Sequence, residues 1–198
     1  MTFLAMALFS TIRLMSAGAD AGGLPEKAQT AVHRERAYFE AALPENWTQV
    51  PLGMGLSPDE KKVYGITLLG PDEGGGSAPR ISAHYFAPEN LVDKTADKYI
   101  RVHSSKPPAA GAAFPALPRV KGGKVGGRKA EIFANVTRER GEGDEVAVIW
   151  ESFAVLRAEK GYYALRLSAP AGRYAEFLPV FEAFLASFKP LLKAGKGE

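Results

Sequence analysis

The chain has 198 residues, of which 46% are hydrophobic and 24% are charged, with a net charge of +3. This composition is typical of one globular domain with its own core, and it excludes wholesale disorder. The small, dispersed excess of basic residues is not the clustered Lys and Arg surface that nucleic acid requires. Because the chain has no cysteine, disulfides, thiolate nucleophiles and cysteine metal sites are excluded as well.

Residues 1–21 have the pattern of a secretory signal peptide. The run MTFLAMALFSTIRLM is apolar except for Arg13 and is too short to cross a bilayer. Ala17 and Ala19 in the following SAGADAGG give the small-x-small pattern of a signal peptidase site. We therefore expect a periplasmic or secreted protein, without a lipid anchor because no cysteine follows the run. The alternative is an N-terminal helix of the mature protein, because no basic residue precedes the apolar run.

A single domain is expected over residues 36–190, preceded by a flexible lead-in at 22–35. The domain opens with RAYFEAALPENWTQVP, which is typical of an extended segment broken at Pro44. Trp47 in this segment is a candidate core residue.

Five β-rich runs follow along the chain. The runs at 63–70 and 79–87 flank PDEGGGSA, which predicts a hairpin with a loose loop. The runs at 129–140, 145–157 and 161–169 are joined by the short turn-forming segments GEGD and AEKG. These three runs are therefore predicted to form an antiparallel meander.

Between the two groups of strands, PENLVDKTADKYIRVHSS predicts a helix that opens at Pro88 and Glu89. The proline-rich segment 105–119 predicts an extended connecting loop, since proline at this density does not allow regular structure.

The last predicted element is an amphipathic helix, after which residues 191–198 are expected to be a disordered tail. Pro179 should kink or restart this helix because proline has no N–H to donate. Seven large apolar residues recur at steps of three and four, and they are expected to pack on the sheet: Tyr174, Phe177, Leu178, Phe181, Phe184, Leu185 and Phe188.

Three segments resemble the PsbP-like superfamily, which includes PsbP and DcrB-type bacterial exported proteins. They are LPENW at 43–47, GYYALRLSAP at 161–170 and the closing SF at 187–188. The resemblance implies an α+β fold, an α/β/α sandwich in which helices flank a central antiparallel sheet. It also implies a non-enzymatic protein that binds other proteins or supports an assembly.

The basic glycine stretch RVKGGKVGGRK is the most prominent charged motif. It is not a phosphate-binding P-loop, because Arg128 and Lys129 follow Gly127 where Lys and Ser or Thr are required. One interpretation is a turn whose lysines keep an exposed sheet edge soluble. The other is a partner-binding patch for anionic lipid headgroups or an acidic protein, formed by Arg119, Lys121, Lys124, Arg128 and Lys129.

No catalytic or metal-binding pattern is present. His33, His84 and His103 do not have the spacing of a zinc site. Ser82 and His84 share a strand face, but side chains at i and i+2 lie alongside each other rather than head-on. We expect no enzyme activity, no cofactor and no metal.

The sequence therefore predicts a non-catalytic, exported binding or assembly-support protein of the cell envelope that acts through protein contacts. The expected partner is an envelope protein, with peripheral membrane contact allowed, no nucleic acid, and a monomeric state. The alternative is a carrier of a small hydrophobic or anionic ligand.

Overall fold

The computed structural model describes residues 31–51, 55–72, 77–104, 120–140 and 146–195. The predicted segments 1–21 and 105–119 lie outside these residues. Within the described ranges the chain forms two sheets and three helices. In chain order the elements are β1 (Val32–Glu35), β2 (Phe39–Ala42), β3 (Thr48–Gln49), α1 (Pro58–Lys61), β4 (Val63–Leu69), β5 (Arg80–Phe86), α2 (Ala96–Ser104), β6 (Lys121–Val125), β7 (Arg128–Arg140), β8 (Val146–Arg157), β9 (Tyr162–Pro170), α3 (Tyr174–Ser187) and β10 (Lys189–Pro190).

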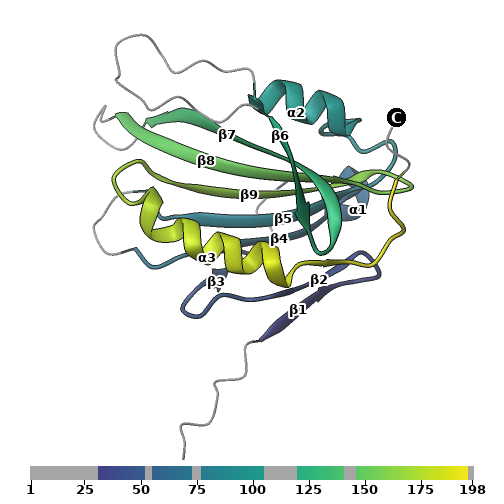
Figure 1. Cartoon of the computed structure of the whole chain (residues 1–198), viewed down its shortest axis with the longest axis horizontal. Helices are drawn as coiled ribbons and strands as arrows, with labels where there is room; N and C mark the ends of the chain where they lie inside the picture. The colour runs from purple at the N-terminus through teal and green to yellow at the C-terminus, as the bar shows by residue number, and fades with distance from the viewer. Residues whose placement is uncertain (1–30, 52–54, 73–76, 105–119, 141–145, 196–198) are drawn as a thin grey trace, which may run out of the picture.

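The larger sheet has seven antiparallel strands in the order β3-β4-β5-β9-β8-β7-β6 (Figure 1). The predicted β4–β5 hairpin and β7–β8–β9 meander are both present. The two groups join through β5 and β9, which pair along their whole length from Arg80 opposite Ser168 to Phe86 opposite Tyr162. Strand β9 therefore lies at the centre of the sheet.

Helices cover both faces of this sheet, so the fold is the expected α+β sandwich. Helix α3 lies across one face (Figure 1), where Phe177, Phe181 and Phe184 are buried among alternate residues of β4, β5 and β9. Helix α2 packs on the other face, where Tyr99 joins Phe153 of β8 and Tyr162 of β9. Adjacent residues of a strand point to opposite faces, and Tyr162 and Tyr163 accordingly enter different clusters.

Helix α3 runs without a break through Pro179, so no restart is present. Pro179 is exposed, which keeps its ring away from the sheet. The aromatic stripe is core, as predicted, and Trp47 packs edge-on against Phe177 with ring centroids 5.9 Å apart.

A second sheet, β1-β2-β10, corrects both ends of the predicted domain. Residues 32–35, expected in the flexible lead-in, form β1 and pair with β2. The predicted tail is also held against the domain as far as residue 195. Leu191 N donates to Tyr38 O over 2.8 Å, and Ala194 forms a bridge with Ala158. The ordered domain is thus longer at both ends than the sequence indicated.

Helix α2 is shorter than predicted, because it begins at Ala96 rather than at Pro88. The side chain of buried Asn90 accepts hydrogen bonds from the backbone N–H groups of Val92 and Asp93, which holds a turn there instead. Thr95 Oγ1 then accepts from Lys98 N at the start of the helix. Leu91 and Val92, which lie within the predicted helix, are exposed in the segment before α2.

Gly65 allows β4 and β5 to approach closely. Its φ is +157°, and a Cβ atom at this position would lie 2.0 Å from Ala83 O on the neighbouring strand. At Gly172, in the turn before α3, an added Cβ atom would meet nothing within 4 Å. Any larger residue at position 65 must therefore move the sheet backbone, whereas position 172 has room.

We predict that Gly65→Ala lowers the free energy of unfolding by roughly 2 kcal/mol or more through backbone strain and displacement. Gly172→Ala should change it by less than about 0.5 kcal/mol. Urea unfolding followed by circular dichroism measures both. Equal effects of the two substitutions would contradict the strand spacing described here.

Candidate functional site

The α2-side face of the large sheet carries polar residues beyond the end of the helix. Strand register places Thr67 of β4 opposite Ser82 of β5, and Ser82 opposite Arg166 of β9. One step along the strands, Arg80 lies opposite Ser168, and one step the other way, His84 lies opposite Ala164. Alternate residues of each strand share a face, so these side chains form one polar surface.

This surface is the floor of a recess of about 360 Å³, which we call the polar groove. Its polar floor is formed by Thr67, Arg80, Ser82, His84, Arg166 and Ser168. Its wall is formed by Phe86, Val92, Asp93, Tyr99 and His103.

The wall of the polar groove is aromatic and firmly packed. The ring of Tyr99 lies 5.6 Å from that of Phe86 and 4.2 Å from that of His103. Phe86 stacks in turn on Tyr162 at 4.8 Å. Burial raises the pKa of Tyr99 far above its ordinary value, so its hydroxyl stays protonated at neutral pH. The aromatic part of the wall is therefore packed against its neighbours, with Phe86 and Tyr99 both buried.

Arg166 is held in place from below. Its guanidinium bonds to the carboxylate of Glu151, whose side chain is only 2% exposed, and lies 5.8 Å from the ring centre of Phe153. Its Nε atom is buried and has no hydrogen-bond partner among the described residues. A buried, unpaired donor costs about 1–3 kcal/mol. The contacts that orient Arg166 thus leave its Nε–H group without a hydrogen bond among the described residues.

His84 is neutral in the folded chain. Burial, assisted by the nearby charge of Arg166, lowers the pKa of His84 from its ordinary 6.5 to about 4. Although Ser82 lies two residues away on the same face, no hydrogen bond joins these two described residues. At neutral pH the imidazole is therefore a weak base and a neutral hydrogen-bonding group.

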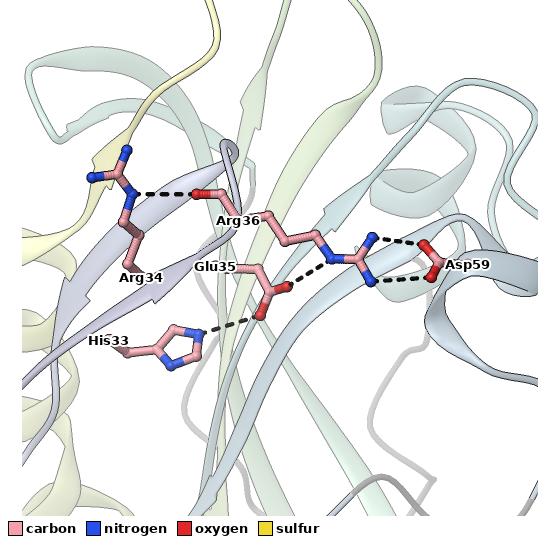
Figure 2. A network of polar contacts seen from close by, with 5 residues as sticks. All are labelled: His33, Arg34, Glu35, Arg36 and Asp59. Atoms are coloured by element: carbon pink, nitrogen blue, oxygen red, sulfur yellow. Dashed lines mark hydrogen bonds and ion pairs between the residues drawn. The ribbon is translucent and has the colours of Figure 1, made fainter.

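A second recess, of about 400 Å³, continues from the polar groove and shares Thr67 and His84 with it. Its far rim contains Glu35 and Arg36, which belong to the network in Figure 2. Arg36 donates to both carboxylate oxygens of Asp59, at 2.7 and 3.1 Å, and lies over the ring of Tyr64.

The same network extends to the other side of Glu35. One of its carboxylate oxygens lies 3.3 Å from His33 Nε2 and the other 3.9 Å from Arg36 Nε. These contacts tie the β1–β2 turn to α1, because Asp59 belongs to that helix. Exposed ion pairs of this kind each contribute at most about 1 kcal/mol. The network therefore fixes the rim without forming a reactive centre.

The described residues of the predicted basic patch do not all share one face of the sheet. Lys124 and Lys129 are exposed and lie directly opposite each other on β6 and β7. Lys121 is an odd number of residues from Lys124 and so faces the other side of β6. Arg128 is half-buried and donates to Pro190 O over 3.1 Å, and Arg119 lies outside the described residues. A partner-binding role for this segment stays a prediction.

Sequence reasoning identified Ser82 and His84 on one strand face, and alternation along the run 161–169 places Arg166 and Ser168 on one face of another strand. It did not join them, because β5 and β9 are distant in the sequence and their pairing has no local signal. The alternation of polar residues on the face opposite the core residues was the available clue.

Two further properties of the described residues bear on function. No group of three or more His, Asp or Glu residues among them lies close enough together to hold a metal ion. In the same part of the chain, no helix is long and apolar enough to cross a membrane.

The sequence matches no protein-family model and no curated protein. Among solved structures, the chain is similar to the crystal structure of LpqN, involved in cell envelope biogenesis of Mycobacterium tuberculosis. The two share 11% identity over 77% of this chain and 82% of that one, with a TM-score of 0.41. A likeness of this size assigns neither a family nor a function to the chain.

We predict that His84 makes the protein less stable in acid. The unfolded chain takes up a proton near pH 6.5, but the folded chain does so only near pH 4. The free energy of unfolding therefore keeps the full contribution of the neutral imidazole above pH 6.5. This contribution, up to about 3 kcal/mol, is lost as the pH falls towards 4. Urea unfolding of the wild type and of His84→Asn at pH 7.5 and 4.5 measures this. Equal losses in the two proteins would contradict the assignment.

Proposed function

We propose that the protein is a non-catalytic binding protein of the PsbP-like type, exported to the cell envelope, which holds a ligand in the polar groove. One observation carries this proposal: the two faces of the large sheet differ in what covers them. The α3 side is closed by the aromatic stripe, whereas the α2 side leaves arginines, hydroxyls and a neutral histidine around a preformed recess. Polar groups converging in such a recess are typical of a binding site.

A binding role without catalysis is supported by the chemistry of the groove. A general base should have a pKa near the working pH, and that of His84 is about 4. The hydroxyls of Ser82 and Ser168 have no base bonded to them among the described residues. These groups can donate and accept hydrogen bonds, but nothing activates them as nucleophiles.

The PsbP-like assignment is supported by the positions of the three resembling segments. Tyr163 of GYYALRLSAP lies in the central strand, and its ring is 5.6 Å from that of Phe188 in the closing SF. Trp47 of LPENW packs on Phe177 of α3, the helix that ends just before Phe188. The segments that carry the resemblance thus meet in one cluster beneath α3, where packing constrains their residue types. Export is supported by the signal-like pattern of residues 1–21.

Native mass spectrometry of protein freshly isolated from its own host tests the binding role. We expect a bound mass in the wild type and its loss in Ser82→Trp, because an indole at this position fills the groove. Ala183→Trp, on the exposed side of α3, should keep the bound mass. An identical ligand-free spectrum for all three proteins would contradict the proposal.

Fractionation of the host cells tests the location. We expect the protein outside the cytoplasm, with a mature N-terminus close to residue 21. An uncleaved chain confined to the cytosol would contradict export but would leave the groove's binding role standing.

A further inference from the structure

We propose that the ligand of the polar groove is an amphiphilic carboxylate, a monoanion that carries an apolar chain of medium length. This inference deepens the proposed function and rests on it. Three properties of the groove carry the inference: its charge, its unpaired hydroxyls and the position of its apolar wall.

The charged residues of the groove favour a ligand with a single negative charge. Glu151 pairs with Arg166, and Asp93 lies 3.6 Å from Lys98. Arg80 is exposed and has no ion-pair partner among the described residues, while His84 is neutral at pH 7. Of the lining residues Arg80, Asp93 and Arg166, only Arg80 therefore has a charge without an ion-pair partner among the described residues. A monoanion neutralises it, whereas a dianion would leave one charge unpaired near Glu151.

The hydroxyls suit an oxygen acceptor. Ser168 is only 7% exposed, yet its side chain lines the groove and has no hydrogen-bond partner among the described residues. The half-buried hydroxyls of Ser82 and Thr67 also line the groove and have no hydrogen-bond partner among the described residues. Ser168 lies opposite Arg80, and Ser82 lies opposite Arg166. Each arginine thus has a hydroxyl donor beside it, and together they can donate to both oxygens of a carboxylate.

The apolar part of the wall, which also contains Asp93 and His103, lies on the side of the groove away from Arg80. Phe86 and Tyr99 form its inner part, and Val92, which is 51% exposed, forms its outer rim. A volume of about 360 Å³ is at the lower end of the range for small-molecule sites. A chain of medium length fits this space, with its head at the arginines and its tail along the rim.

The test is isothermal titration calorimetry of the full chain as isolated, at pH 7.5 and low salt, below the critical micelle concentration of each probe. Decanoate should bind with one-to-one stoichiometry, and decan-1-ol at least tenfold more weakly because it has no charge. Decyl phosphate should bind no more tightly than decanoate. Equal affinity for the alcohol, or tighter binding of the phosphate or of an apolar hexapeptide, would overturn the inference.

Matched variants locate the site. Arg80→Gln should weaken decanoate binding about tenfold, whereas Lys124→Gln, which removes an exposed cation elsewhere, should leave it unchanged. Val92→Ser should weaken binding several-fold, whereas Val146→Ser should not, although both valines are 51% exposed. Because all four positions are exposed, these variants should fold, and circular dichroism checks this. Wild-type affinity in both groove variants would overturn the inference.

The two proposals fail in different ways. If native mass spectrometry shows a groove-bound mass but decanoate does not bind, the ligand class is wrong and the binding role stands. If the groove is empty in the isolated protein and decanoate does not bind, both are wrong.

Discussion

The packing of α3 on the central strands is the interaction on which the rest of the structure depends. Phe181 and Phe184 of α3 and Phe188 after it are almost fully buried, and they meet Phe39 of β2 and Tyr163 of β9. Burial of each such side chain contributes about 1.5–3 kcal/mol. The cluster also joins the two sheets, because Phe39 belongs to β2 and β10 directly follows Phe188. The larger cluster of buried apolar side chains therefore lies on one face of the large sheet.

Among the described residues, the opposite face is covered by the short helix α2 alone. The turn at Asn90 delays the helix until Ala96, so its nine residues cover the aromatic part around Phe153 and Tyr162 but not the polar part around Ser82 and Ser168. In the part of the chain that the structure describes, the polar groove therefore lies beside α2, on the face of the sheet opposite α3.

Much of this fold could be predicted from the sequence because its signals are local. Alternation in GYYALRLSAP and the stripe from Tyr174 to Phe188 each repeat within a few residues. The β1-β2-β10 sheet could not be predicted, since β10 pairs with a strand about 150 positions earlier and has only two residues of its own. The β6–β7 hairpin was missed although its Gly126-Gly127 turn has the sequence of a two-residue hairpin loop, and both glycines have positive φ. The groove was missed because its residues meet only through the β5–β9 pairing.

The central claim is that one face of the sheet holds the molecule together while the other binds a ligand. Methyl NMR spectra recorded during a titration with decanoate test this most directly. The account predicts that the methyl signals of Thr67 and Val92 shift with the ligand, while those of Leu178 and Leu185 on α3 stay in place. Shifts confined to the α3 methyls, or no saturable shift on the α2 side, would contradict it.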